Sequence, residues 1–212
     1  MEKLYVQYGC GLSAPPKWVN FDTSPTLRLQ KTPIIGSLLK SKLNTVFPEN
    51  VRYGDIITGL PVKDNSCDGV YCSHVLEHLS LTDFRIALAN TYKILKAGGT
   101  FRCVVPDLEL LARMYLKALE NNSESASIDF MGPQTLLGVY ERPKGLKGFM
   151  ASYFANSHHL WMWDNYSLAN ELKKAGFKEV RRAEFNDSED AAFKLVEDSS
   201  RFEDAVALDC KK

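Results

Sequence analysis

The stretch LPVKDNSCDGVYCSHVLEHL, residues 60–79, decides how this sequence is interpreted. Its middle part, CDGVYCS (67–73), is a short run rich in apolar residues, which predicts a buried strand. Its last part contains His74, Glu77 and His78 with the spacing H-x-x-E-H. That spacing holds zinc when both histidines lie on one face of a continuous helix and a third ligand comes from elsewhere.

The residues on either side of the motif argue against such a helix. A strand precedes His74, and the next helix is predicted to begin only after Ser80, where Ser80 and Asp83 form a capping-box-like pair. The two histidines then need not share a face, and we expect no metal site. We expect Glu77 and His78 to organise the loop by hydrogen bonds and His74 to face a substrate. A zinc hydrolase remains an alternative, and it predicts stoichiometric metal.

Strand and helix patterns alternate along the rest of the chain. Further strands are predicted at 3–9, 18–22, 50–55, 100–106, 178–185 and 205–210, and helices in part of 26–43, from Ser80 to the Gly98-Gly99 pair, at 107–120 and at about 164–175. This alternation predicts an α/β fold, with a Rossmann-like, mostly parallel sheet and helices on both faces. The length of 212 residues fits a single domain, residues 1–212.

Two parts of the chain depart from a regular alternation. Only LSAPPK separates Gly11 from Trp18, which is too short and too rich in proline for a helix, so the first β-α unit is shortened. Residues 121–163 are rich in Asn, Ser, Gly and Pro, with scattered aromatic residues. We interpret them as an insertion after the fifth strand and as a candidate lid.

Composition narrows the classes of partner. Lys and Arg together number 26, as do Asp and Glu, so the formal net charge is zero, and we expect no nucleic-acid partner. No apolar run is long enough for a membrane helix, and the first residues lack a secretory signal. The five cysteines show no C-x-x-C spacing, which favours a reducing, cytoplasmic location.

Candidate binding residues are found at the ends of the predicted strands, because ligands of parallel sheets bind at the carboxyl ends of strands. Glycines there let the backbone approach a ligand closely, and an acid after the second strand commonly holds a ribose hydroxyl. An acid after the third strand can accept a hydrogen bond from an exocyclic amine. The strand-end residues are Tyr8, Gly9, Cys10, Gly11, Asp22, Asp55, Ser73, His74, Pro106 and Asp107.

The stretch 60–79, followed by ILKAGGTFRCVVPDL (94–108) and LKKAGFKEV (172–180), resembles class I S-adenosylmethionine-dependent methyltransferases. It is most similar to the methyltransferase type 11-like branch, which has an HVLEHL motif after the fourth strand. The resemblance covers the first six strands and implies S-adenosylmethionine as the cofactor. It implies that Gly9 and Gly11 lie under the methionine part, that Asp22 holds the ribose, that Asp55 and the backbone of Ile56 meet the adenine, and that Ser73 and His74 reach the sulfonium end.

The sequence also departs from this family. Gln7 stands where an acid is often found, Ser13 stands where a third glycine is often found, and the shortened first unit removes the helix that normally faces the cofactor. We therefore keep a catalytically silent binding or interaction module of the same fold as an alternative. Cover for the cofactor has to come from elsewhere, and residues 121–163 are the candidate.

The leading hypothesis is methyl transfer to a small-molecule or sugar-like acceptor. Histidine suits the removal of a proton from a hydroxyl near neutral pH. The candidate catalytic residues are His74, His158 and Asp107; for His158 and its neighbour His159 a surface or partly packed pair remains the alternative, and Asp107 also suits the N-cap of the following helix. We expect neither a nucleic acid nor a membrane as partner, and the sequence leaves room for a homo-oligomer.

Overall fold

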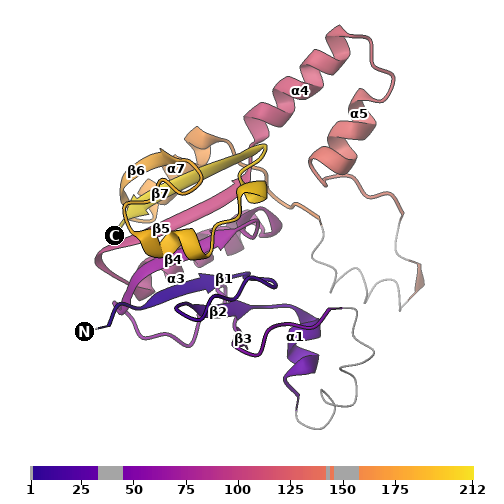
Figure 1. The fold of residues 1–212 in the computed structure, drawn as a ribbon. Coiled ribbons are helices and arrows are strands. Elements are labelled where there is room, and N and C mark those ends of the chain that lie inside the picture. The colour runs from indigo at the N-terminus through magenta and orange to yellow at the C-terminus, as the bar shows by residue number, and fades with distance from the viewer. Residues whose placement is uncertain (1, 33–44, 142–143, 146–157) are drawn as a thin grey trace.

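The computed structural model describes residues 2–32, 45–141, 144–145 and 158–212 (Figure 1). A seven-stranded sheet forms the centre of the fold. Its strands in spatial order are β3 (Val51–Tyr53), β2 (Val19–Asp22), β1 (Tyr5–Tyr8), β4 (Cys67–Ser73), β5 (Leu95–Pro106), β7 (Ala205–Lys211) and β6 (Lys178–Ala183). β7 pairs antiparallel with both of its neighbours, and all other pairs are parallel. The predicted mostly parallel sheet is therefore confirmed, and β1 to β5 all end at the same edge.

Two helices cover one face of the sheet. α3 (Leu81–Ile94) begins after Ser80, whose hydroxyl accepts a hydrogen bond from the amide of Asp83, as predicted. α7 (Asn165–Lys174) begins after Asp164, which forms a capping box with Ser167. Phe84 and Leu88 of α3 and Leu168 and Leu172 of α7 belong to one buried apolar cluster with side chains of the sheet. Burial of these side chains holds the two helices on the sheet.

The predicted end of α3 was wrong. The helix ends at Ile94, and the chain continues directly into β5, in which Leu95 pairs with Cys67 of β4. Gly98 does adopt a left-handed conformation, with φ +77°, but it lies within β5 rather than at a helix end. Residues 96–99 form an irregularity in the strand between Leu95, which pairs with Cys67, and Thr100, which pairs with Gly69. Of the helix expected within 26–43, α1 (Pro25–Gln30) is described and residues 33–44 lie outside the described residues.

Segments other than long helices cover the opposite face of the sheet. Residues 9–18, all of which are described, contain no helix, so the shortened first β-α unit is confirmed. Two short helical turns from the connection between β6 and β7, at Ala191–Leu195 and Ser199–Arg201, lie on this face instead. Phe193 packs edge-on against Trp18, with ring centroids 5.4 Å apart, and the Trp18 indole donates to the carbonyl of Ala192. A segment late in the sequence thus covers the face that the missing helix leaves open.

A buried ion-pair cluster stabilises this cover. Arg102 of β5 is fully buried, and its guanidinium contacts Glu197, Asp187 and Asp209 and the carbonyl of Glu184. The Asp209 carboxylate lies 3.2 Å from the guanidinium and the Asp187 carboxylate 2.8 Å. Because burial of an unpaired charge costs several kcal/mol, the guanidinium requires these carboxylates. The cluster joins the 184–204 connection to the centre of the sheet.

The chain leaves the sheet after β5. α4 (Leu108–Glu120) extends away from the sheet, and α5 (Ala126–Asp129) lies near its far end (Figure 1). A further helical turn at Phe130–Gln134 follows, and the chain returns at residues 158–163. The expected insertion at 121–163 is described only in part, because residues 142–143 and 146–157 lie outside the described residues. Its role as a lid stays a prediction.

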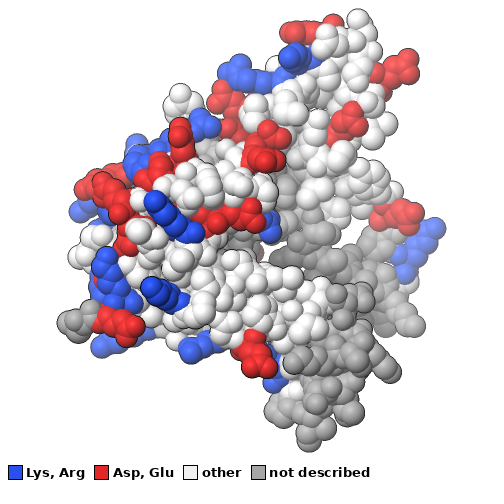
Figure 2. Space-filling model, in the orientation of Figure 1, with Lys and Arg blue, Asp and Glu red and all other residues white. Residues whose placement is uncertain are grey.

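Charged side chains of both signs are interspersed on the face shown in Figure 2. None of the helices in the described part of the chain combines the length and the apolar character that a membrane crossing needs.

Candidate functional site

The turn after β1 is built from glycines in left-handed conformations. Gly9 has φ +63° and Gly11 has φ +54°, a region that residues with a side chain rarely adopt. A Cβ at Gly9 would lie 2.2 Å from Cγ2 of Val75, so the loop that follows β4 packs directly on this turn. A Cβ at Gly11 would have no atom within 4 Å among the described residues. The backbone at Gly11 is therefore open to close approach by a ligand.

Asp22 is the last residue of β2 and Asp55 follows β3, so acidic side chains lie at the ends of both strands, as the sequence predicts. Asp22 Oδ2 accepts a hydrogen bond from the amide of Gly11 at 2.9 Å, and Oδ1 accepts from the amide of Ser24 at 2.8 Å. Asp55 Oδ1 accepts from the amide of Ile57. A carboxylate oxygen has two lone pairs, so each of these groups keeps acceptor capacity for a hydroxyl or an amine. Asp22 also holds the glycine turn against the end of β2.

The other candidate cofactor-binding residues have their side chains engaged in the core. Tyr8 is buried, and its hydroxyl lies 3.2 Å from that of Thr91. Ile56 is buried, and the Asn90 side chain donates to its carbonyl. Burial, with a smaller effect of the Asp22 charge, raises the pKa of the Cys10 thiol to about 12. These three residues can meet a ligand only through their backbone, and Cys10 is not a reactive thiolate.

β4 ends with two polar residues that were predicted from the sequence. The hydroxyl of Ser73 is buried and has no hydrogen-bond partner among the described residues. His74 adopts a left-handed conformation with φ +53°, which is unusual for a residue with a side chain and occurs often at functional sites. Its Nε2 donates to the carbonyl of Arg201 at 2.9 Å, and its Nδ1 lies 3.4 Å from Oε1 of Glu77. Burial lowers the pKa of His74, but Glu77 and the Arg201 carbonyl outweigh it and raise the pKa above its ordinary value.

Glu77 lies at the centre of the histidine motif. Its side chain is fully buried, and neither carboxylate oxygen has a hydrogen-bond partner among the described residues. Oε1 lies 3.9 Å from Nε2 of His78 and 4.0 Å from Nε2 of His159. Three imidazoles, those of His74, His78 and His159, therefore surround one buried carboxylate. The expected loop-organising hydrogen bonds are present for His78, whose Nδ1 lies 3.0 Å from the carbonyl of His158.

The returning segment of the insertion is docked on the same motif. The carbonyl of Glu77 accepts hydrogen bonds from the amides of Leu160 and Trp161, at 2.7 and 3.1 Å. His159 is buried, and burial lowers its pKa, with only part of the effect offset by Glu77. The backbone contacts and the imidazole contacts together fix residues 158–161 beside the end of β4.

A cavity of about 480 Å³ opens at the ends of β4 and β5. Its walls combine the histidine motif with the start of α4, the insertion and the end of the 184–204 connection. It is lined by His74, Glu77, His78, Pro106, Leu111, Met114, Pro133, Gln134, Leu136, His159, Arg201, Glu203 and Asp204. This volume is typical of a site for a small molecule.

Two of the predicted catalytic residues, His158 and Asp107, do not line this cavity. His159 lines the cavity, whereas the exposed ring of His158 has Nδ1 3.3 Å from the carbonyl of Leu136. Asp107 caps α4, since its Oδ1 accepts from the amides of Glu109 and Leu110. Its Oδ2 lies 3.6 Å from the Arg182 guanidinium. The structure therefore gives Asp107 the helix-capping role that was its alternative, and it brings His74 but neither His158 nor Asp107 to the cavity.

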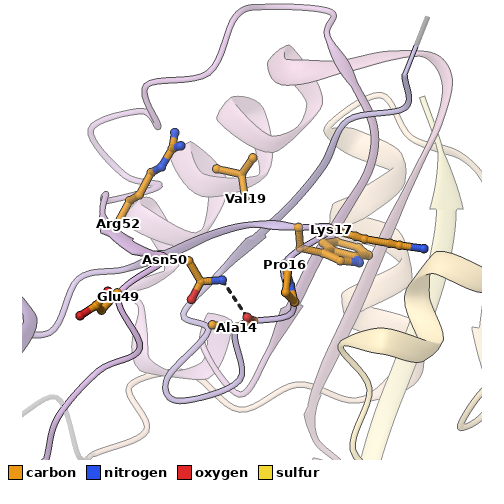
Figure 3. A pocket seen from close by; sticks show the side chains of 8 residues that line it. Ala14, Pro16, Lys17, Val19, Glu49, Asn50 and Arg52 are labelled. Carbon is orange, nitrogen blue, oxygen red and sulfur yellow. Dashed lines mark hydrogen bonds between the residues drawn. The ribbon is translucent and has the colours of Figure 1, made fainter.

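A second cavity, of about 570 Å³, lies at the other end of the parallel strands, where β2 and β3 begin (Figure 3). Residues at the starts of β2 and β3 line it: Ala14, Pro16, Lys17, Trp18, Val19, Glu49, Asn50 and Arg52. The Asn50 side chain donates to the carbonyl of Ala14 at 2.8 Å. It is therefore separate from the glycine turn and the histidine motif, which lie at the carboxyl ends of the strands.

Sequence reasoning missed several parts of the cavity. It assigned Glu77 to loop organisation and did not separate His159 from His158. It also missed Arg201, Glu203 and Asp204, because they lie in a polar connection far along the chain. The H-x-x-E-H spacing was the available signal for Glu77, and nothing in the sequence shows which of two adjacent histidines is buried.

The residues at the cofactor edge fit S-adenosylmethionine. Gly11 leaves open space beside its backbone, Asp22 presents acceptors for hydroxyl groups, and Ser73 offers a buried hydroxyl without a partner among the described residues. These groups lie at the carboxyl ends of β1, β2 and β4, where nucleotide ligands bind in this class of sheet.

The chain resembles known methyltransferases in sequence pattern and in fold. Residues 7–103 match the family model described as a methyltransferase domain. A solved structure from Thermotoga maritima, a SAM-dependent methyltransferase described as a possible histamine N-methyltransferase, aligns with a TM-score of 0.51. It is 19% identical, and the alignment covers 100% of this chain and 83% of that one. A SAM-dependent methyltransferase from Archaeoglobus fulgidus aligns with a TM-score of 0.48 at 15% identity, over 99% of this chain and 86% of that one.

A search of curated proteins finds no significant match. At these identities the likeness to solved structures concerns the fold alone. The match to the methyltransferase domain spans residues 7–103, slightly less than half of the 212 residues. Together with the strand order and the strand-end residues, this match supports a class I S-adenosylmethionine-dependent methyltransferase, an enzyme whose cofactor is S-adenosylmethionine.

Proposed function

We propose that the protein transfers a methyl group to a small-molecule or sugar-like hydroxyl acceptor bound in the cavity of about 480 Å³. The observation that supports this most directly is the position of His74. It lines the cavity and directly follows Ser73, and Val75 beside it packs on the glycine turn at Gly9. The three consecutive residues Ser73, His74 and Val75 thus connect the cofactor-binding strand ends with the acceptor cavity. The cavity combines apolar walls with several polar groups, a combination that suits a small polar molecule.

We assign cofactor binding to the strand ends. The backbone at Gly9, Cys10 and Gly11 passes under the methionine part, and Asp22 accepts hydrogen bonds from the ribose. Asp55 and the backbone of Ile56 meet the adenine, while Ser73 and His74 lie toward the sulfonium. When bound, S-adenosylmethionine supplies a methyl group on a positively charged sulfur. The Tyr8 side chain stays in the core, so only its backbone takes part.

The chain's own contribution is mainly alignment. An in-line displacement gains much of its rate from holding the two reactants in the right geometry. The Arg201 carbonyl and Glu77 engage both ring nitrogens of His74, so its ring forms a fixed part of the cavity wall against which an acceptor can be held. Asp107 acts as a positioning residue, because it caps α4, which carries Leu111 and Met114 of the cavity wall. His158 contributes its backbone carbonyl, which holds His78.

The proposal is tested by binding and transfer assays on the same protein. Calorimetric titration with S-adenosylhomocysteine measures the cofactor site, and transfer of a labelled methyl group to a panel of sugars and small hydroxyl compounds measures the activity. We expect Asp22→Ala to weaken cofactor binding by on the order of 1–3 kcal/mol, because it removes hydrogen bonds to the ribose and to the glycine turn.

Asp64→Ala is the matched control, since Asp64 is half exposed and its nearest ion-pair partner is Lys93 at 3.5 Å. Equal affinities of the two variants and the unmodified protein would remove Asp22 from the cofactor site. Tight cofactor binding with label transferred only to amines, and to no hydroxyl compound, would overturn the proposed acceptor class.

A further inference from the structure

Four side chains of the cavity converge on one point. Oε1 of Glu77 lies 3.4 Å from His74 Nδ1, 3.9 Å from His78 Nε2 and 4.0 Å from His159 Nε2. The ligand atoms of Glu77, His78 and His159 all lie within 4.8 Å of one another. Two ligands of a tetrahedral zinc ion with bonds of about 2.1 Å are about 3.4 Å apart. A contraction of about half an ångström, within the reach of side-chain rotation, would bring Glu77 Oε1 to such a distance from each of the two nitrogens.

The outer nitrogens of two histidines are already fixed. A carbonyl oxygen can only accept, so His78 Nδ1 carries the hydrogen that it donates to the His158 carbonyl. In a neutral ring, the lone pair of Nε2 then points to the side of Glu77. The Arg201 carbonyl fixes His74 in the same way, with its Nδ1 toward Glu77. Metal-binding histidines almost always donate their second ring hydrogen to a carbonyl or carboxylate, which fixes the ring and its tautomer.

Among the described residues, no Lys or Arg pairs with the Glu77 carboxylate. Glu77 is fully buried, and within the described parts of the chain its ion-pair contacts are to histidines only. Both of its oxygens lack a hydrogen-bond partner there, as does Nδ1 of the buried His159. A buried carboxylate needs a compensating charge, and nitrogen lone pairs directed at it require either a proton or a metal ion between the groups.

We propose that Glu77, His78 and His159 bind a divalent transition-metal ion of the zinc class at the inner end of the cavity, with His74 beside it. Two imidazoles and a carboxylate suit zinc better than magnesium, which prefers oxygen ligands. Three protein ligands leave a coordination position open, and all three of these residues line the cavity. An oxygen of a bound acceptor can occupy it. The sequence-based expectation of no metal is thereby revised, because the third ligand comes from the far end of the insertion.

Metal binding can be measured without any methyl acceptor. The purified chain, freed of metal with a chelator and dialysed, is titrated with ZnCl₂ in a calorimeter, and with MgCl₂ for comparison. We expect one zinc ion per chain and much weaker binding of magnesium. Glu77→Gln and His159→Asn should each lower zinc affinity by about tenfold or more, since each removes a ligand.

The adjacent histidine provides a matched control. His158→Asn removes an exposed imidazole next to His159 but keeps the backbone carbonyl that holds His78, so zinc affinity should stay unchanged. If the unmodified protein binds no zinc, or if His158→Asn weakens binding as much as His159→Asn, the site is wrong. Equal affinities of Glu77→Gln and the unmodified protein would also overturn it.

Thermal unfolding separates loss of the site from loss of the fold. Zinc should raise the Tm of the unmodified protein, because a ligand that binds only the native state stabilises it. The metal-free Glu77→Gln variant should be at least as stable as the metal-free protein, since an amide removes the buried charge, and zinc should not raise its Tm. A zinc-induced Tm rise of the same size in Glu77→Gln would contradict the proposal. These readouts do not require methyl transfer, so the metal site and the proposed function can fail independently.

Discussion

Two glycines in one turn are expected to respond differently to the same substitution. Gly11→Ala should cost on the order of 1–2 kcal/mol, because it forces a side chain into a left-handed backbone with φ +54° but meets no described atom. Gly9→Ala should cost distinctly more, because its Cβ would also lie 2.2 Å from Val75 Cγ2. Urea denaturation of both variants measures the difference in the free energy of unfolding.

Val75→Ala provides the control for this comparison. Combined with Gly9→Ala in a double-mutant cycle, it should recover part of the cost, since it removes the methyl group that the new Cβ would meet. Equal destabilisation by Gly9→Ala and Gly11→Ala would mean that the motif loop does not press on the turn.

At the residue scale, the sequence predicts positions at strand ends but not burial. Gly11, Asp22, Ser73 and His74 could be proposed because a strand pattern followed by a polar residue or glycine is visible locally. The exposure of His158 and the burial of His159 depend on which residue contacts Glu77, about 80 positions away, and no local pattern records that.

The contact between α3 and α7 is expected to depend on pH. Arg85 on α3 and Lys174 on α7 hold the pKa of Glu171 at about 2, well below its ordinary value of 4.5, mainly through the hydrogen bond from Arg85. A carboxyl whose pKa is lower in the native state stabilises the fold above its unfolded pKa, and this contribution is lost as the pH falls through the native pKa. Glu171→Gln should therefore lower stability at pH 7, and its difference from the unmodified protein should shrink between about pH 5 and 2.

Glu109→Gln is the comparison for this element. Glu109 pairs with Arg113 four residues along α4, where Arg113 is largely exposed and Glu109 is partly exposed, so loss of this pair should have little effect at any pH. A Glu171→Gln difference that is the same at pH 7 and pH 2.5 would show that the ion pair does not join the two helices. Chemical denaturation at several pH values measures both variants.

At the scale of elements, helices were easier to predict than the cover of the second face. Ser80, Asp107 and Asp164 precede apolar residues at helical spacing, and all three cap helices in the structure. Residues 184–204 contain many acids and a few scattered apolar side chains, with no period of helix or strand. Their structure comes from contacts of Phe193 with Trp18 and Tyr5, which local propensity cannot show.

The integrity of the whole sheet is expected to depend on Arg102. Arg102→Met should destabilise the protein by about 3–5 kcal/mol, because it leaves the buried carboxylate of Glu197 without its cation and Asp209 with Arg181 alone. Arg113→Met, on the exposed side of α4, should have almost no effect. Thermal and urea unfolding of both variants test this, and a loss below about 1 kcal/mol for Arg102→Met would show that the cluster adds little to the fold.

At the scale of the whole molecule, the sequence predicted the sheet, its mostly parallel pairing and the missing first helix. The order of strands and helix patterns is enough for the first two, and the proline-rich LSAPPK for the third. Two features could not be predicted: the segment that covers the sheet face without a first helix, and the return of the insertion to the histidine motif. Both depend on contacts between residues more than 70 positions apart. Such contacts leave no local pattern.

The late cover of the second face has a consequence for how the chain folds during synthesis. Tyr5, Trp18 and Tyr71 lie within residues 5–71, whereas Phe193, which covers them, is synthesised more than 100 positions later. Until Phe193 has been synthesised, the aromatic side chains of the first strands have no such cover. Contacts of such high sequence separation slow folding, and exposed apolar surface favours aggregation. We therefore expect the sheet to become stable only after the segment around Phe193 has been synthesised.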